Sequence, residues 1–247
     1  MKKKNILAVI PARMKSSRFP GKPLADLCGK PMVVWASLAA QKSELISEVV
    51  VATDSKEIAD ACRRYRIESV LTREDHATGT DRLAEVASLR NADIYVNVQG
   101  DEPLIEPSTI DAAIYGLLKN RGYEVVNLCA KITNHADLIN ATVPKVALGP
   151  DKQAVFFSRC PIPYPKNPKE AAYYRQVCVY VFTKKSLMNF SSFKQGPLER
   201  AEEIELLRFL EYGMPIKMVE VKTRSFGIDM PADLKKAVAL LKGAHSR

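Results

Sequence analysis

The sequence predicts an α/β protein with a doubly wound, mostly parallel β-sheet and a less regular, partly antiparallel second half. Short apolar runs alternate with segments of helical periodicity four times before residue 120, an order typical of such sheets. The first apolar run is continuous, as in parallel strands that are covered by helices on both faces. After residue 120 this alternation is lost, which indicates a different, partly antiparallel arrangement.

Each predicted strand in the first half is followed by a loop that opens a helix. Strands are expected at 5–10, 49–52, 68–71 and 93–97, and helices at 32–42, at 80–89 and from Pro107 onward. Pro107 suits a first helical position, where a backbone N–H has no partner to lose. Another helix should begin near 54–57, where Glu57 stands at the capping-box position.

The second half is expected to hold more strands than helices. Strands are expected at 125–132, 143–148, 154–157, 175–182 and 216–221, and helices at 198–211 and around 234–241. Prolines within 161–165 require an extended, irregular loop. The last helix repeats apolar residues at helical spacing, so we expect it to pack on the core as a lid.

The composition restricts the class of protein and its partners. The 247 residues include 37 Lys and Arg and 28 Asp and Glu, a net charge of +9 that suits an anionic partner. The apolar stretch after the basic N-terminus is too short for a signal peptide, and nothing approaches a membrane span. The five cysteines are scattered without metal-ligand or disulfide spacing. We therefore expect reduced thiols, a cytoplasmic location and no membrane partner.

A loop rich in cations follows the first predicted strand. Arg13, Lys15, Arg18 and Lys22 fall within ten residues, together with two serines. Arginine can hold phosphate oxygens bidentately and lysine adds a point charge, so the loop suits a triphosphate. Each Gly-Lys pair here is followed by Pro, so this is no P-loop, and no Gly-x-Gly-x-x-Gly indicates a dinucleotide oxidoreductase. A solvent-exposed basic loop is the alternative.

The stretch Val98-Gln99-Gly100-Asp101-Glu102-Pro103 follows the strand at 93–97, at the edge where open α/β sheets bind ligands. Gly100 should let the backbone approach a bound group closely. Asp101 and Glu102 offer oxygen ligands of the type that Mg²⁺ prefers. A polar turn with solvated acids is the alternative.

The segment 72–82 links the third strand to the next helix. Its small and hydroxyl residues could place backbone N–H groups and a helix N-terminus against an anion or a base edge. We assign no catalytic role to His76, because such a histidine is more often structural.

An ordered set of motifs resembles the CMP-Kdo synthetase family, also called 3-deoxy-manno-octulosonate cytidylyltransferase. The motifs cover nearly the whole chain, at 10–13, 17–24, 51–54, 72–73, 81–82, 97–103, 157–159, 162–165, 197–199 and 227–231. The Pro-Tyr-Pro at 163–165 is similar to a capsule-associated subgroup. The resemblance implies a nucleotidyltransferase-like fold. It also implies that CTP and a 3-deoxy-2-ketosugar acid give a CMP-sugar and pyrophosphate, for lipopolysaccharide or capsule synthesis.

The resemblance implies catalysis by Arg13, Lys22, Asp101 and Asp229. Two Mg²⁺ ions would be bound in part by the two aspartates, and a metal there would lower the pKa of the attacking anomeric hydroxyl. Arg13 and Lys22 would hold the β- and γ-phosphates as pyrophosphate leaves. Asp229 has an alternative role as a cap for the helix that Pro231 begins. The whole interpretation requires Lys22, Asp101 and Asp229 to meet around one triphosphate.

Recognition of the cytidine nucleotide is expected to fall to the first loops. Backbone carbonyls near Ala12 and the side chains of Arg73, Thr78 and Gln99 are candidates for contacts to the cytosine edge. The residues expected to bind CTP are Pro11, Ala12, Arg13, Arg18, Lys22, Ala52, Asp54, Arg73, Thr78, Gly79, Gln99 and Gly100.

The sugar is expected to bind Gln99, Arg159, Gln176, Tyr180 and Glu205. Arg159 would pair with the sugar carboxylate, and a surface salt bridge is the alternative. The family usually has His at Gln176 and Gln at Leu206, two positions expected to contact sugar hydroxyls. Because an unpaired polar group costs about 1–3 kcal/mol, the sugar could differ from Kdo at a distal hydroxyl or amino group.

Two other functions stay open. A sugar-1-phosphate nucleotidylyltransferase would need no activating metal at Asp229, because its attacking group is already anionic. A nucleic-acid-binding module would line cations along one face, whereas here they gather beside carboxylates that repel a polyanion. We expect one domain over 1–247, with a nucleotide-binding half at 1–122, a sugar-binding and dimerisation half at 123–230 and a C-terminal helix at 231–247. The resemblance also implies a homodimer.

Overall fold

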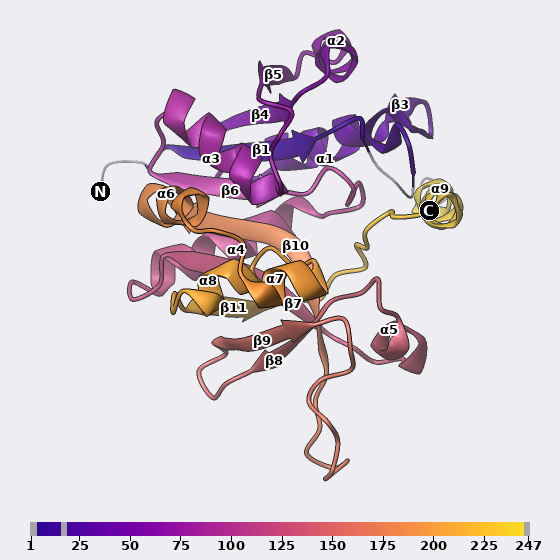
Figure 1. The fold of residues 1–247 in the computed structure, drawn as a ribbon. Coiled ribbons are helices and arrows are strands. Elements are labelled where there is room, and N and C mark those ends of the chain that lie inside the picture. Colours follow the sequence, from indigo (N-terminus) through magenta and orange to yellow (C-terminus); the bar gives the residue numbers. More distant parts are fainter. Residues whose placement is uncertain (1–3, 16–18, 245–247) are drawn as a thin grey trace.

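The computed structural model describes residues 4–15 and 19–244 (Figure 1). Nine of the described strands form one sheet: β1 (Ile6–Ala12), β4 (Glu48–Thr53), β5 (Glu68–Leu71), β6 (Ile94–Val98), β7 (Val125–Lys131), β8 (Lys145–Leu148), β9 (Ala154–Ser158), β10 (Tyr174–Thr183) and β11 (Ile216–Glu220). The order along its main path is β11-β7-β10-β6-β1-β4-β5, and β8 and β9 extend it from β10. A short hairpin of β2 (Asp26–Leu27) and β3 (Lys30–Pro31) lies apart from this sheet.

The first-half strands form a parallel array. β1 pairs in parallel with both β4 and β6, and β4 pairs in parallel with β5. β10 then pairs antiparallel with β6 and with β7, whereas β11 runs parallel to β7. The predicted fold, a mostly parallel sheet with a partly antiparallel second half, is therefore confirmed.

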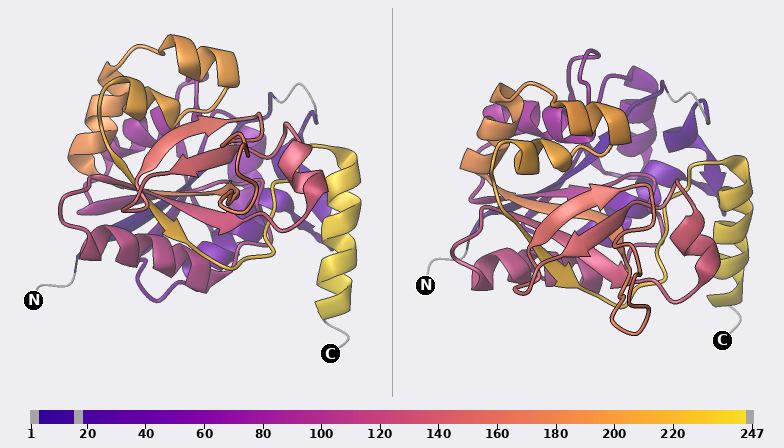
Figure 2. Two further views of the ribbon diagram at one scale, coloured as in Figure 1. Left: turned by 90° about the horizontal axis from the view of Figure 1, so that it is seen from below. Right: turned by 60° about the horizontal axis from the view of Figure 1, so that its bottom comes forward.

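Helices cover both faces of the sheet (Figure 2). They are α1 (Met32–Gln41), α2 (Lys56–Arg64), α3 (Gly79–Leu89), α4 (Pro107–Lys119), α5 (His135–Ile139), α6 (Lys184–Ser192), α7 (Pro197–Glu202), α8 (Leu207–Glu211) and α9 (Pro231–Ala244), with a 3₁₀ turn η1 (Lys22–Leu24). The core on one face includes residues of α1, α2 and α4, and the core on the other includes residues of α3, α6 and α8. In β1, Ala8 and Ile10 belong to the first core and Leu7 and Val9 to the second, which explains its continuous apolar sequence.

The helices of the second half differ from prediction. The helix expected at 198–211 is two helices, because Glu203 has a left-handed φ of 50° that a right-handed helix cannot contain. The sequence analysis also misses α5 and α6. Their caps were visible signals, since Asn134 accepts the Asp137 N–H and Thr183 accepts the Ser186 N–H.

The capping box stands at a different helix from the expected one. At α2 the cap is Ser55, which accepts the Ile58 N–H, so the prediction for Glu57 is wrong. A reciprocal capping box is present at α3, between Thr78 and Asp81. It fixes the N-terminus of α3, which borders the site described below.

The C-terminal helix α9 lies at the side of the sheet rather than over its core (Figure 2). Ala237 is fully buried, in a small cluster with Leu27, Met32 and Ile228 that is separate from the two sheet cores. The predicted lid therefore packs beside the β2–β3 hairpin and α1. Within 4–15 and 19–244, no helix combines the length and the apolar character needed to cross a membrane.

Candidate active site

A pocket of about 280 Å³ opens at the carboxyl ends of β1 and β6, the edge that the sequence predicts. Four segments meet there: the loop after β1, the N-terminus of α3, the loop after β6 and the residues before α9. The lining residues are Pro11, Ala12, Arg13, Lys15, Lys22, Pro23, His76, Thr78, Gly79, Arg82, Gln99, Gly100, Asp101 and Asp229.

Lys22 joins two carboxylates that are far apart in the sequence. Its Nζ lies 2.6 Å from Asp101 Oδ2 and 3.3 Å from Asp229 Oδ1. Burial acts to lower the pKa of Lys22, but the charges and hydrogen bonds of Asp101 and Asp229 outweigh it and raise that pKa above its usual value. The three residues required to meet at one site therefore do so, with Lys22 held in its cationic form.

Hydrogen bonds from backbone N–H groups hold the segments that carry the two carboxylates. The Ile228 N–H donates to the Asp101 carbonyl at 2.9 Å, which ties the residues before α9 to the loop after β6. Asp233, in the first turn of α9, accepts the N–H groups of Asp229 at 3.2 Å and Met230 at 3.0 Å. The helix start is thus capped by the Asp233 side chain, while the Asp229 side chain faces Lys22.

At the base of the pocket, Gly100 packs closely on the end of β1. A Cβ there would lie 3.2 Å from Ile10 Cγ2 and 3.3 Å from the Pro11 carbonyl oxygen. Glycine at this position therefore lets the loop after β6 pack on the end of β1, which adds to the predicted close approach to a ligand.

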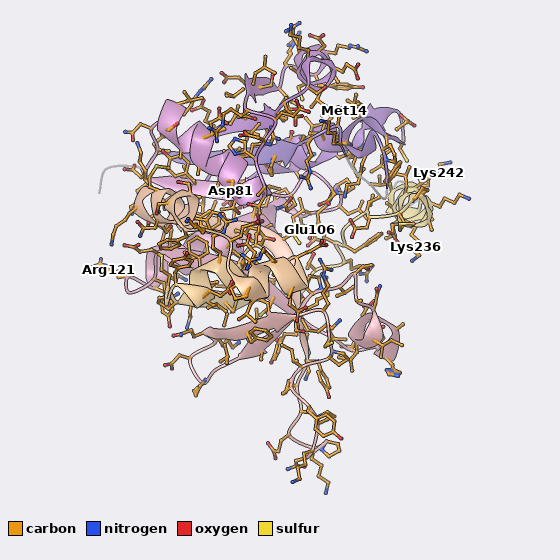
Figure 3. All side chains as sticks on the ribbon, in the orientation of Figure 1. Met14, Asp81, Glu106, Arg121, Lys236 and Lys242 are labelled. Carbon is orange, nitrogen blue, oxygen red and sulfur yellow. The ribbon has the colours of Figure 1, made fainter. Side chains whose placement is uncertain are left out.

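A second cavity, of about 1360 Å³, adjoins the first and shares Arg13, Asp101 and Asp229 with it. It includes four of the residues expected at the sugar site: Arg159, Gln176, Tyr180 and Glu205. Gln99, the fifth, lines the smaller pocket. Lys236, which is labelled on α9 in Figure 3, also lines this cavity.

Backbone carbonyls hold the guanidinium of Arg159. Nε donates to the Glu202 carbonyl at 2.6 Å, Nη1 to that of Ala141 at 2.9 Å and Nη2 to that of Glu203 at 3.2 Å. Among the described residues these carbonyls, and no salt bridge, hold the side chain, so the surface salt bridge considered above is wrong. Three of its five N–H donors are used, which leaves two for an incoming carboxylate.

Glu205 connects the second half to the first. Its Oε2 accepts the Thr80 N–H at 3.0 Å and its Oε1 accepts Gln99 Nε2 at 3.4 Å. Burial raises the pKa of Glu205, and its hydrogen bonds offset part of that rise. Burial also raises the pKa of the Tyr180 hydroxyl, which is therefore a neutral group in the cavity wall.

The two departures from the family pattern have different positions. Gln176 lines the larger cavity, and its Nε2 donates to Asn127 Oδ1 at 3.3 Å. Leu206 is fully buried in the sheet core and lines neither cavity. The expectation that residue 206 contacts the sugar therefore does not agree with this structure, because its side chain packs inward.

Comparison with known proteins decides the family. A family model described as "Cytidylyltransferase" matches residues 7–218. A protein of Geobacter sulfurreducens named 3-deoxy-manno-octulosonate cytidylyltransferase is 44% identical, over 96% of this chain and 100% of its own length. The chain belongs to the 3-deoxy-manno-octulosonate cytidylyltransferase family. An Escherichia coli protein of the same name is 40% identical, with 94% of each chain covered.

Solved structures agree with membership of this cytidylyltransferase family. A structure described as CMP:2-keto-3-deoxy-manno-octonic acid synthetase complexed with CTP matches with a TM-score of 0.92 at 38% identity, covering 97% of this chain and 99% of that one. A 4-diphosphocytidyl-2C-methyl-D-erythritol synthase of Anaerococcus prevotii, with a TM-score of 0.64 at 16% identity, shares the fold alone. The resemblance drawn from the ordered motifs is confirmed, and the protein is a cytidylyltransferase.

Several residues expected to bind CTP in this cytidylyltransferase lie elsewhere. Ala52 is fully buried in a sheet core, and Asp54 Oδ2 accepts a hydrogen bond from Arg82 Nη2 at 3.0 Å. Arg73 is exposed, with its Nε 3.3 Å from Asp75 Oδ1. None of these three lines either cavity, and Arg18 lies outside the described residues.

The smaller pocket is also lined by four residues that were not predicted as site residues, namely Lys15, Pro23, Arg82 and His76. Arg82 is only 2% exposed and also donates to Thr72 Oγ1 at 2.5 Å. A cation on the apolar face of a helix, next to Leu83, was the signal for it. His76 contacts Glu85 of α3, which also accepts the Arg73 N–H, in keeping with a structural role.

Glu102 does not stand at the mouth beside Asp101. It is 2% exposed, and its Oε1 accepts the Cys178 N–H at 3.0 Å while its Oε2 accepts the Ser225 hydroxyl at 2.8 Å. Burial raises the pKa of Glu102, and these two hydrogen bonds lower it in part. The prediction that Glu102 stands at the mouth is therefore wrong, because its carboxylate is buried at the wall of the larger cavity.

Asp101 and Asp229 fit a Mg²⁺ ion bound together with a nucleotide. Oxygens of both lie within 3.3 Å of one cationic nitrogen, so the two carboxylates already face a single positive charge. Mg²⁺ is usually held by one or two carboxylates plus substrate phosphates and water. No cluster of three or more His, Cys, Asp or Glu side chains suited to a metal occurs within the described residues.

Proposed function

We propose that this cytidylyltransferase transfers the cytidylyl group of CTP to Kdo, or to a closely related 3-deoxy-2-ketosugar acid, and that it requires Mg²⁺. The products are the CMP-sugar and pyrophosphate. The observation that carries the proposal is the meeting of Lys22, Asp101 and Asp229 at a pocket that the cationic loop after β1 also lines.

The residues of the chain fit this transfer through position and charge. Arg13 lines both cavities, and with Lys22 it would bind the phosphates that leave as pyrophosphate. The two N–H donors that remain on Arg159 would bind the sugar carboxylate in the larger cavity. Mg²⁺ held by Asp101 and Asp229 would neutralise phosphate charge and lower the pKa of the sugar hydroxyl.

A panel of nucleotides and acceptors tests the proposal. Pyrophosphate release should require CTP, Mg²⁺ and a 3-deoxy-2-ketosugar acid together, and UTP, GTP or ATP should not replace CTP. Release with a sugar 1-phosphate in place of the keto acid would instead favour the sugar-1-phosphate nucleotidylyltransferase. The same assay identifies the sugar: kcat/KM for Kdo should fall within about 10⁴–10⁸ M⁻¹s⁻¹. A value below that range, with a higher one for an analogue changed at a distal hydroxyl or amino group, would show that the sugar differs from Kdo.

We further propose a cytoplasmic homodimer that serves lipopolysaccharide or capsule synthesis. The segment between β9 and β10 projects from the rest of the second half (Figure 1), and Tyr164 within it is 86% exposed. The five cysteines are free thiols, which suits a reducing compartment. Light scattering should give about twice the chain mass of 27.5 kDa, and a mass equal to one chain would contradict the dimer.

A further inference from the structure

Glu102 is a buried carboxylate to which the proposed chemistry gives no task. It follows Asp101 directly in the chain and also lines the larger cavity, where its two oxygens accept hydrogen bonds from Cys178 of β10 and Ser225. A carboxylate that is 2% exposed is costly to bury, so its two hydrogen bonds must serve the fold or the site.

Ser225 belongs to the segment 222–229, here called the strap, which connects β11 to α9 and ends at Asp229. Although the neighbouring Arg224 is exposed, Ser225 is 1% exposed and its hydroxyl donates to Glu102 at 2.8 Å. Arg175 Nη2 donates to the carbonyls of Thr223 at 3.2 Å and Ser225 at 2.9 Å. The strap is therefore held by side chains at its middle and by the Ile228 N–H near its end.

We propose that Glu102 is a positioning residue that fixes the strap so that Asp229 stays opposite Asp101. Glu102 is joined to Asp101 by one peptide bond, and Ser225 lies four residues before Asp229. The bond between Glu102 and Ser225 therefore connects the backbones that carry the two carboxylates. With Ile228 bonded to the Asp101 carbonyl, it gives two attachments between the strap and the loop after β6. This inference rests on the proposed function, because that function makes Asp101 and Asp229 the Mg²⁺ ligands.

Ser225→Ala tests the inference with the smallest change, since it removes only the hydroxyl group that donates a hydrogen bond to Glu102. Glu102→Gln is the second variant, because its amide can still accept the Cys178 N–H and donate to the Ser225 oxygen. Ser186→Ala is the matched control: Ser186 is also fully buried, and its hydroxyl donates to the Glu124 carbonyl, in contact with neither cavity.

Two measurements do not depend on turnover. Mn²⁺ serves as the probe for the metal site, and its binding to the protein–CTP complex is followed by electron paramagnetic resonance. For Ser225→Ala we expect the Mn²⁺ dissociation constant to rise about 10–100-fold, the usual cost of removing a support behind a metal ligand. In Ser225→Ala the Ile228 amide should also exchange with deuterium faster, while the affinity for CTP without metal should stay the same. Glu102→Gln should lose less Mn²⁺ affinity than Ser225→Ala. Ser186→Ala should match the wild type in all of these.

Unchanged Mn²⁺ affinity in Ser225→Ala would overturn the positioning role, even if the Ile228 amide exchanged faster, because the strap would then be loosened without consequence for the metal. The failure of the proposed function is a different result. In that case the wild-type protein would release no pyrophosphate from CTP with any keto acid.

Discussion

Asp229→Asn is expected to reduce kcat by at least about a hundredfold with the fold intact, and Asp101→Asn is expected to do the same. Asparagine keeps the shape of the side chain but removes its negative charge. That charge now faces the Lys22 ammonium group, and it would face Mg²⁺ when CTP is bound. Loss of one group that stabilises charge in a transition state typically costs about 10²–10³ in kcat. Pyrophosphate release at saturating CTP and Mg²⁺ measures the effect.

A surface aspartate supplies the matched control for these variants. Asp60 of α2 is about half exposed and pairs with Arg63 on the same helix, and it lines neither cavity. Asp60→Asn should therefore retain the wild-type kcat. Far-ultraviolet circular dichroism should be the same for all three variants. Wild-type turnover in Asp101→Asn or in Asp229→Asn would remove that aspartate from the metal site.

The half of the site that lies at strand ends could be predicted from local patterns. The apolar run of β1 and the cationic loop behind it place Lys22 at the carboxyl edge of the sheet, and the run of β6 places Asp101 at the same edge. Asp229 was different, because no local pattern shows that the strap returns to bond the Asp101 carbonyl through Ile228. It entered the predicted site only through the resemblance of its motif to a family.

The residues that the sequence analysis misplaced are those whose partners lie far away in the chain. Asp54 follows a strand as a ligand-binding residue would, but the Asp54 carboxylate forms an ion pair with the buried Arg82. Glu102 stands beside a predicted metal ligand, but its partners come from β10 and from the strap. The break between α7 and α8 depends on the left-handed backbone at Glu203, whose carbonyl Arg159 also bonds. In each case a tertiary contact overrides a reasonable local interpretation.

Arg208→Met is expected to lower the free energy of unfolding by about 3–5 kcal/mol, the usual cost of removing one partner from a buried ion pair. Arg208 is 2% exposed, and its Nε and Nη2 each lie 2.7 Å from an oxygen of the equally buried Glu199. Its Nη1 also lies 2.8 Å from Asp81 Oδ1, and its guanidinium lies over the Phe190 ring. Methionine would leave the Glu199 charge without its cation in the core.

Arg90→Met is the control that shows whether the loss of stability depends on the burial of the arginine or on the number of its ion pairs. Arg90 also pairs with two carboxylates, Glu48 and Glu68, but its side chain is 32% exposed, so its loss should cost about 1 kcal/mol or less. Urea unfolding at one pH compares the two variants, and equal losses would mean that water reaches the Arg208 network. The network also reaches the site, because Asp81, which is labelled in Figure 3, forms the capping box with Thr78 in the pocket wall. In Arg208→Met, α8 would no longer hold the start of α3, so this variant should also bind CTP more weakly. Arg90→Met should bind CTP as the wild type does.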